Sequence, residues 1–228
     1  MSIIEFKNIS YGYIDGNKQR MILNDLSYQF EQGKFYTILG PSGSGKTTFL
    51  SIAGGLERTQ KGQVLFKGED INKIGLTKHR RNNLATIFQQ YNLIPYLKAF
   101  ENVVNVMEIT NNDVPKPYEG TAFNILNKLG IVESKARRSV LKLSGGEQQR
   151  VAIARGLATN VDIILADEPT GNLDTATEKE IIKIFKSLAT EYNKCVIVVT
   201  HSDVVSDFSD IKLQLVDGKL VERKWVTS

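Results

Sequence analysis

The most informative stretch of the chain is Gly40-Pro41-Ser42-Gly43-Ser44-Gly45-Lys46-Thr47-Thr48. It contains a glycine, four further residues, then Gly-Lys and a threonine, and this spacing is typical of a loop that binds phosphate groups. A short apolar run at 35–39 precedes the loop, and apolar residues recur at helical spacing from Phe49 to Ala53. The pattern therefore predicts a strand, a glycine-rich loop and a helix in succession.

The residues of this loop suit a polyphosphate ligand. Gly43 and Gly45 allow the backbone to curl so that its N–H groups point inward, where the positive end of the following helix adds to their field. We expect Lys46 to reach the β- and γ-phosphates, Thr47 to place its hydroxyl on Mg²⁺, and Thr48 to lie beside the α- and β-phosphates. The alternative is a plain glycine-rich turn, which the four-position match and the strand–loop–helix setting both disfavour.

Length and composition favour one large α/β domain. The 228 residues are 41% hydrophobic, which is enough for a substantial core. The N-terminus has no basic segment leading into an apolar one, and no apolar run approaches the roughly 18 residues of a membrane span, so we expect a cytosolic or peripheral protein. Cys195, the single cysteine, excludes a disulfide framework. The net charge of +4 is scattered along the chain and gives little support to nucleic-acid binding.

The rest of the chain alternates predicted strands and helices around a helix-rich middle. Alternating apolar and polar residues predict antiparallel strands at 3–9 and 26–30, and Asp217-Gly218 predicts a type I′ hairpin turn near the C-terminus. Because strand signals are sparse between about 90 and 160, we interpret that part as a helical lobe inserted into the α/β core. Further strands are expected at 35–39, 64–66, 85–88, 163–166 and 195–199, and helices at 77–83, 99–108, 118–129, 133–138 and 175–190.

A second candidate anion site follows Leu143. Ser144, Gly145 and Gly146 precede Glu147 and a helix whose apolar residues recur from Val151. Serine is a favoured helix cap, and a helix N-terminus bared by glycines can bind an anion. A plain capped surface helix is the alternative, and nothing in the sequence of a monomer requires this site to meet the first.

Acidic residues and a histidine end two predicted core strands. Asp167 and Glu168 follow the buried run at 163–166, and His201 follows the run at 195–199. Ligands of open parallel sheets gather at the carboxyl ends of the strands. We expect Asp167 to orient the Mg²⁺ shell and Glu168 to face the γ-phosphate and polarise water. The alternatives are a solvated acidic pair and a structural histidine.

Taken in this order, the motifs resemble the ATP-binding subunit of an ATP-binding-cassette (ABC) transporter over nearly the whole chain. The sequence from Leu143 to Gln148 is highly specific when it occurs together with the other motifs. The resemblance implies an α/β fold: a P-loop NTPase core with a mostly parallel sheet, an antiparallel β subdomain and an inserted helical subdomain. Residues 1–89 and 161–228 would form the core, and 90–160 the helical subdomain with the signature motif.

The resemblance also implies roles for individual residues. Tyr13 looks like the aromatic that stacks on adenine, with Tyr11 less favoured, and Gln89 like the glutamine that senses the γ-phosphate, the metal and the membrane partner. Glu168 resembles the general base, His201 the switch histidine, and Asp174 the aspartate that crosses a dimer interface. Two chains would pack head to tail in an ATP-bound homodimer, so that the signature residues Ser144, Gly145, Gly146 and Glu147 of one chain close over ATP held by the other.

Two strings are similar to the macrolide-efflux and lipoprotein-release branch of the family, at 88–95 and 166–174. This similarity implies a separate transmembrane permease subunit with an extracytoplasmic region, a peripheral location on the cytoplasmic face of the plasma membrane, an amphiphilic substrate and no nucleic acid. An ATP-driven regulator of a cell-envelope enzyme and a soluble nucleic-acid ABC protein are the alternatives. The aromatic and proline residues within 91–107 predict the surface on which the membrane subunit docks.

The chain departs from the family pattern at two places. It has Thr47-Thr48 where Ser-Thr is commoner, and Ser202 where an aspartate usually follows the histidine.

Overall fold

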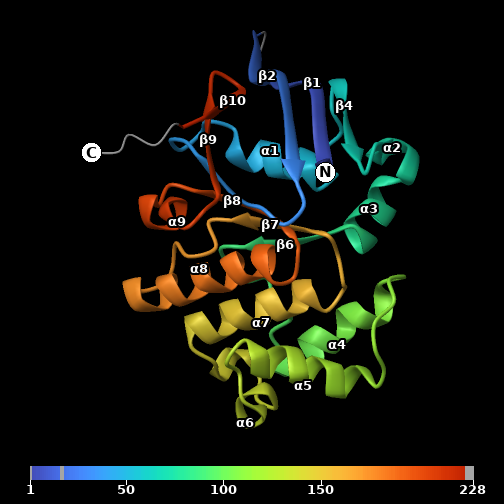
Figure 1. Cartoon of the computed structure of the whole chain (residues 1–228), viewed down its shortest axis with the longest axis vertical. Coiled ribbons are helices and arrows are strands. Elements are labelled where there is room, and N and C mark those ends of the chain that lie inside the picture. The colour runs from blue at the N-terminus through green and yellow to red at the C-terminus, as the bar shows by residue number, and fades with distance from the viewer. Residues whose placement is uncertain (1, 16–17, 224–228) are drawn as a thin grey trace.

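A computed structural model of the chain describes residues 2–15 and 18–223, and its centre is a six-stranded sheet (Figure 1). The strand order is β10-β9-β3-β8-β7-β6, in which β3, β6, β7, β8 and β9 are parallel and β10 is antiparallel. The strands are β3 (Phe35–Leu39), β6 (Leu84–Phe88), β7 (Ile163–Asp167), β8 (Cys195–Thr200), β9 (Ile211–Val216) and β10 (Lys219–Glu222). The mostly parallel core sheet is therefore confirmed.

A second, antiparallel sheet lies beside the first and has the order β2-β1-β4-β5. Its strands are β1 (Ser2–Asp15), β2 (Lys18–Glu31), β4 (Lys61–Phe66) and β5 (Glu69–Asp70). Both long strands extend beyond the predicted 3–9 and 26–30, because bulges at Ile9 and Tyr11 and a positive φ of 51° at Asp25 interrupt the alternation of side chains. The Asp217-Gly218 turn has φ values of 49° and 76°, as the predicted type I′ turn requires.

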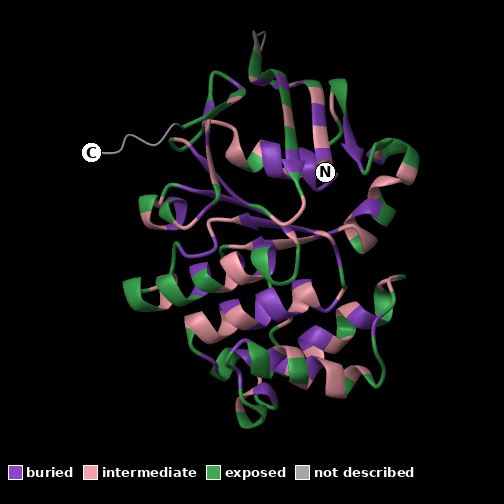
Figure 2. Cartoon of the chain, viewed as in Figure 1, coloured by how far each residue is buried: buried purple, intermediate pink, exposed green. Residues whose placement is uncertain are grey.

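The helices cover both faces of the central sheet. Alternate residues of β8 show the division, since Ile197 and Val199 pack toward α1 and the antiparallel sheet, whereas Val196 and Val198 pack toward α7 and α8. Figure 2 shows the resulting buried layers on each side of the sheet. The helices are α1 (Lys46–Ala53), α2 (Ile71–Ile74), α3 (Leu76–Asn82), α4 (Ala99–Ile109), α5 (Tyr118–Lys128), α6 (Glu133–Ala136), η1 (Val140–Lys142), α7 (Gly145–Leu157), α8 (Thr175–Thr190) and α9 (Asp203–Asp207).

Helices α4 to α7 gather on one side of the central sheet, at the bottom of Figure 1. One apolar cluster runs from Val103 and Leu126 in these helices to Val151 in α7 and Ile164 in β7. In the described part of the chain, no helix combines the length and the apolar character needed to cross a membrane.

Candidate active site

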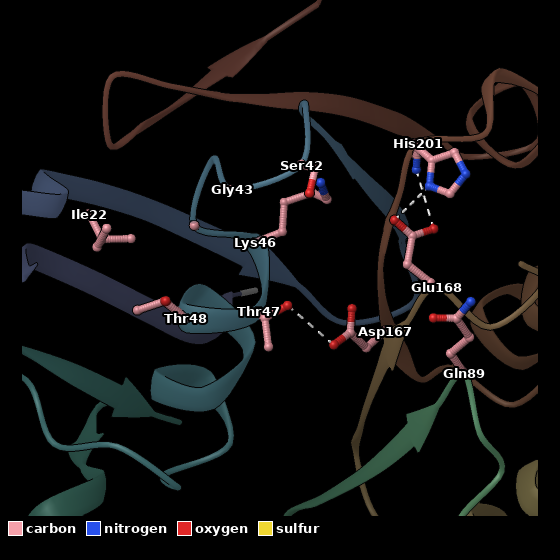
Figure 3. A pocket seen from close by; sticks show the side chains of 11 residues that line it. Ile22, Ser42, Gly43, Lys46, Thr47, Thr48, Gln89, Asp167, Glu168 and His201 are labelled. Atoms are coloured by element: carbon pink, nitrogen blue, oxygen red, sulfur yellow. Dashed lines mark hydrogen bonds and ion pairs between the residues drawn. The ribbon is translucent and has the colours of Figure 1, made fainter. Parts of the chain in front are cut away.

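A cavity of about 670 Å³ opens where the N-terminus of α1 meets the carboxyl ends of β6, β7 and β8. Its volume falls within the range of small-molecule sites, and it lies where ligands of parallel sheets bind. Figure 3 shows the side chains of the phosphate loop facing those of the three strand ends. The lining residues are Ile22, Ser42, Gly43, Gly45, Lys46, Thr47, Thr48, Gln89, Asp167, Glu168 and His201.

The backbone of the loop leaves the start of α1 uncapped. Gly45 occupies the N-cap position with φ 103°, and no side chain accepts a hydrogen bond from the first turn. A Cβ at Gly45 would lie 2.6 Å from Ile22 Cγ2, so both the positive φ and the space require glycine there. The uncapped N–H groups and the helix dipole make this end of the cavity an anion site.

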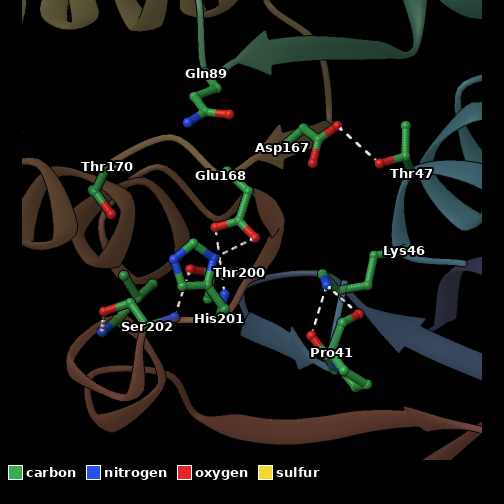
Figure 4. Close-up of polar contacts among 12 residues, drawn as sticks. Pro41, Lys46, Thr47, Gln89, Asp167, Glu168, Thr170, Thr200, His201 and Ser202 are labelled. Carbon is green, nitrogen blue, oxygen red and sulfur yellow. Dashed lines mark hydrogen bonds and ion pairs between the residues drawn. The ribbon is translucent and has the colours of Figure 1, made fainter. Parts of the chain in front are cut away.

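Lys46 contributes the cation of the site. Its Nζ donates hydrogen bonds to the Gly40 carbonyl at 2.7 Å and the Pro41 carbonyl at 3.1 Å, which holds the amine across the loop (Figure 4). The Ser44 N–H donates to the Pro41 carbonyl at 3.2 Å and tightens the turn. Gly40, Pro41 and Ser44 shape the loop without lining the cavity themselves.

A hydroxyl oxygen and a carboxylate oxygen lie close together in the cavity. Thr47 Oγ1 donates to Asp167 Oδ2 at 3.5 Å, which joins the start of α1 to the end of β7 (Figure 3). Burial raises the pKa of the Asp167 carboxyl, and the neighbouring charge of Glu168 raises it further, whereas the Thr47 hydrogen bond lowers it. The site therefore holds an incompletely compensated negative charge, which a bound cation would relieve.

Glu168 and His201 form a pair at the ends of β7 and β8. Glu168 Oε1 lies 2.9 Å from His201 Nδ1, and the His201 backbone N–H donates to Glu168 Oε2 at 3.4 Å (Figure 4). Glu168 has φ 45°, a left-handed conformation that is uncommon for a residue other than glycine. Such backbone strain often occurs at functional sites, and here it accompanies a carboxylate aimed into the cavity.

Gln89 reaches the same cavity from the end of β6. Its Nε2 donates to Asn172 Oδ1 at 3.4 Å, and Asn172 Nδ2 donates to the Gln89 carbonyl at 3.4 Å. This pair of contacts joins the end of β6 to the turn that follows β7. A change in the position of Gln89 would therefore be transmitted to that turn.

The predicted signature residues do not line the cavity. Ser144 caps α7 by accepting a hydrogen bond from the Glu147 N–H, and Glu147 Oε2 accepts one from the Ser144 N–H, so the two residues form a capping box. Glu147 also pairs with Lys135 of α6, and this contact, with the Ser144 N–H, lowers the pKa of the Glu147 carboxyl. Asp174 caps α8 outside the cavity, and its hydrogen bonds from Thr177 and Ala176 lower the pKa of its carboxyl.

Tyr13 also lies outside the residues that line the cavity. It is 48% exposed, whereas Tyr11 is 7% exposed and donates its hydroxyl to Glu57. Between them, the Gly12 N–H donates to Gln60 Oε1 and the Gln60 amide donates to the Gly12 carbonyl. Tyr13 is thus the accessible ring of the two and stands on a strand that is firmly held.

These geometric features agree with the comparison with known families. A family model described as ABC transporter matches residues 23–171. The chain belongs to the ABC transporter family. As a member of this family it is an ABC-type ATP-binding subunit and an ATP hydrolase.

Individual relatives of this ABC cassette cover nearly its full length. It is 46% identical over 98% of both chains to the uncharacterized ABC transporter ATP-binding protein YclH of Bacillus subtilis. It is 37% identical to the lipoprotein-releasing system ATP-binding protein LolD of Francisella tularensis, over 96% of this chain and 95% of LolD, which confirms the predicted branch. A dimeric post-hydrolysis structure of the cassette MJ0796 from Methanocaldococcus jannaschii, bound to ADP and Pi, superimposes with a TM-score of 0.87 at 38% identity, covering 97% of this chain and 98% of that one.

Within the ABC cassette, sequence reasoning missed several residues around the cavity. Ile22 lines it, but an apolar residue in a strand carries no distinctive sequence signal. Asn172 contacts Gln89, but an asparagine in a turn is common for local reasons and carries no separate signal of a site. Gln60 holds the strand of Tyr13 from 48 residues away, which no local pattern could have indicated.

Proposed function

We propose that this chain binds ATP and Mg²⁺ in the cavity, hydrolyses ATP as part of a homodimer, and drives a separate transmembrane subunit that exports or extracts an amphiphilic substrate. The observation that carries the proposal is the cavity itself. It gathers Lys46, Asp167, Glu168, His201 and Gln89 from four separate chain segments around an uncapped helix N-terminus. Few other reactions require a phosphate loop, an oxygen pair for a metal and a candidate base in one site.

In this proposal the loop from Gly40 to Thr48 holds the triphosphate. Lys46 leaves its carbonyl partners and pairs with the β- and γ-phosphates, while Thr48 lies beside the α- and β-phosphates. Tyr13 presents its exposed ring to adenine. Variant Lys46→Ala should bind ATP at least tenfold more weakly in a calorimetric titration, because a charged partner of the phosphates is lost.

The residues present fit a Mg²⁺ ion. Thr47 Oγ1 and Asp167 Oδ2 are 3.5 Å apart and face the cavity, and hydroxyl and carboxylate oxygens are ligands that Mg²⁺ accepts. Gln89 adds an amide oxygen at the same side of the cavity. When bound, the ion would neutralise charge on the β- and γ-phosphates.

We propose Glu168 as the general base and His201 as the residue that orients it. The 2.9 Å contact to His201 Nδ1 fixes one oxygen of Glu168 and leaves the carboxylate at the cavity wall. Glu168→Gln should lower the rate of ATP hydrolysis by about 10² to 10⁴-fold and leave ATP binding intact. The matched control is Glu191→Gln at the far end of α8, and hydrolysis by Glu168→Gln at the wild-type rate would refute the assigned role.

A homodimer would complete the site. Ser144, Gly145, Gly146 and Glu147 stand at the N-terminus of α7 but do not line the cavity of their own chain, so a second copy would have to bring them to the phosphates. Asp174, at the cap of α8, would lie at the interface. Glu168→Gln should therefore elute as a dimer with ATP and as a monomer without it.

The transmembrane partner would dock in a groove of about 490 Å³ between α3, β6, α4 and α7. The groove combines apolar side chains, such as Phe88 and Ile109, with three arginines, Arg80, Arg81 and Arg155, and its lining residues include no acidic side chain. Within the predicted docking segment 91–107 only Val106 lines it. The groove therefore fits a short amphipathic segment with an acidic residue.

Co-purification from gently solubilised membranes tests this docking site. Arg81→Glu should lose the membrane subunit, whereas Lys78→Glu, an exposed residue on the same helix but outside the groove, should keep it. Tyr96→Asp distinguishes the groove from the segment 91–107 as the docking surface. Loss of the membrane subunit in Tyr96→Asp but not in Arg81→Glu would favour the segment 91–107.

Two further measurements test the alternative functions. Stimulation of ATPase activity by an amphiphile in the reconstituted complex would distinguish a transporter from a regulator. Salt-sensitive DNA or RNA binding would support the nucleic-acid alternative.

A further inference from the structure

One carboxylate outside the cavity, Glu178, connects the segment that follows Glu168 with the segment that follows His201. Glu178 stands in the first turn of α8 and is partly buried. Its Oε1 accepts a hydrogen bond from Thr170 Oγ1 at 3.1 Å and another from Ser202 Oγ at 3.0 Å. Because both bonds end on the same oxygen, the positions of the two hydroxyls are coupled through Glu178.

These hydroxyls belong to the segments that leave β7 and β8. Thr170 lies two residues after Glu168 and is 4% exposed, and Ser202 follows His201 directly. Ser202 also accepts the Val205 N–H as the cap of α9, and its own N–H donates to Thr200 Oγ1, so its position is fixed from three sides. The Glu178 oxygen therefore adds a side-chain link between the Glu168 and His201 segments, beside the pairing of β7 with β8 and the bond from the Glu168 N–H to the Val199 carbonyl.

We propose that Glu178 is a positioning residue for ATP hydrolysis, which sets the alignment of Glu168 with His201 through Thr170 and Ser202. The proposal rests on the roles of Glu168 and His201 proposed above. It also gives a physical reason for serine at 202: a hydroxyl there can donate to the Glu178 carboxylate, whereas an aspartate would place a second negative charge within hydrogen-bond distance of it. Glu178 and Ser202 are thus a matched pair.

Steady-state kinetics of the full chain test the proposal. Glu178→Ala and Ser202→Asp should each lower kcat for ATP by about ten- to a hundredfold with an unchanged KM, because only the alignment of the reacting groups is disturbed. The pH profile of kcat should also change shape. Lys179→Ala, an exposed neighbour on the same turn, is the control for general effects on α8.

A double variant tests whether Glu178 positions the Glu168 and His201 segments or only stabilises the fold. In Glu178→Gln/Ser202→Asp, the Gln amide can donate to the new carboxylate while its oxygen still accepts from Thr170, so kcat should recover at least half of the loss seen in Ser202→Asp alone. A variant Glu178→Ala with wild-type kcat and pH profile would overturn the inference. If Glu178→Ala has wild-type kcat while Glu168→Gln is inactive in the same assay, the role of Glu178 fails and the proposed function stands. Failure of the inference is therefore distinguishable from failure of the proposed function.

Discussion

Asp167 and Glu168 are adjacent carboxylates at the end of a buried strand, and burial together with the charge of Glu168 disfavours ionisation of Asp167. Burial and the charge of Glu168 raise the pKa of the Asp167 carboxyl above its value in the unfolded chain. A raised carboxyl pKa means that the ionised form is less stable in the folded protein, so this group lowers stability at neutral pH and lowers it less as the pH falls. The arrangement is unfavourable without a cation and becomes favourable when one binds.

Asp167→Asn should consequently raise the melting temperature of the nucleotide-free protein, by about 2 °C, because the uncompensated charge is removed. The same variant should lose the Mg²⁺-dependent part of the stabilisation that ATP gives. Thermal unfolding with and without ATP and Mg²⁺ measures both effects. Asp113→Asn, in an exposed loop, serves as the control, and a variant Asp167→Asn less stable than the wild type without nucleotide would contradict the argument.

His79 gives a second prediction, on pH. It is fully buried, with Nε2 bonded to the Ala53 carbonyl and Nδ1 bonded to the Asn83 amide. Burial lowers the pKa of His79, and the charge of Arg80 lowers it further, although the hydrogen bond to Ala53 acts in the opposite direction. Because the folded pKa lies below the unfolded value of about 6.5, the stability from neutral His79 is complete above that pH and is lost as the pH falls below it.

Urea unfolding between pH 7.5 and 5.5 should show this loss, with a slope of at most about 1.4 kcal/mol per pH unit from this residue. His79→Gln should flatten the slope. Lys78→Gln, a change at an exposed residue on the same helix, is the control that should retain the slope. If the free energy of unfolding changes equally with pH in the wild type and in His79→Gln, the stability lost at low pH does not come from His79.

At the scale of elements, the segment between β6 and α4 depends on an arginine of α7. Tyr91 and Asn92 both have positive φ, 60° and 48°, and Arg155 of α7 donates to their carbonyls at 3.1 and 2.6 Å. Partial burial lowers the pKa of the Arg155 guanidinium. The two bonds use the planar fork of arginine to hold a turn that its own dihedral angles disfavour.

Arg155→Lys should loosen this turn, because a single amine cannot match the fork that bonds two successive carbonyls. We expect faster hydrogen exchange across 89–97 and a loss of about 1–2 kcal/mol in the free energy of unfolding. Arg81→Lys, exposed in the same groove, is the control. Unchanged exchange across the segment would mean that the turn holds its shape without Arg155.

Elements could be predicted from sequence wherever one local pattern sufficed. The strand, loop and helix around Lys46 and the strand ending at Asp167 follow from local spacing and are confirmed. The sequence could not show that His79, on a polar and basic helix, is fully buried, because Phe66 and Ala53 enclose it from distant segments. The sequence also could not show the groove at α3 and α7, because its arginines come from segments far apart in the chain, and the docking segment 91–107 stays a prediction.

At the scale of the whole molecule, the phosphate loop and the signature helix belong to different parts of one chain. The signature stands at the start of α7, among the helices packed below the central sheet in Figure 1, and the cavity lies at the carboxyl edge of that sheet. The division into a core, 1–89 and 161–228, and a helical subdomain, 90–160, remains a prediction, because a continuous apolar cluster joins α4 and α5 to α7 and β7.

If two copies share each site, two inactive variants should restore activity when mixed. Lys46→Ala damages the phosphate loop, and Ser144→Arg damages the signature, but a mixed dimer contains one site in which both contributions are intact. Random pairing would then give roughly a quarter of the wild-type rate, since half of the dimers are mixed and each has one intact site. The control is the double variant Lys46→Ala/Ser144→Arg mixed with either single variant, because no mixed dimer then has an intact site. Mixed dimers that form, as shown by differential tagging, but remain as inactive as this control would refute a site shared between chains.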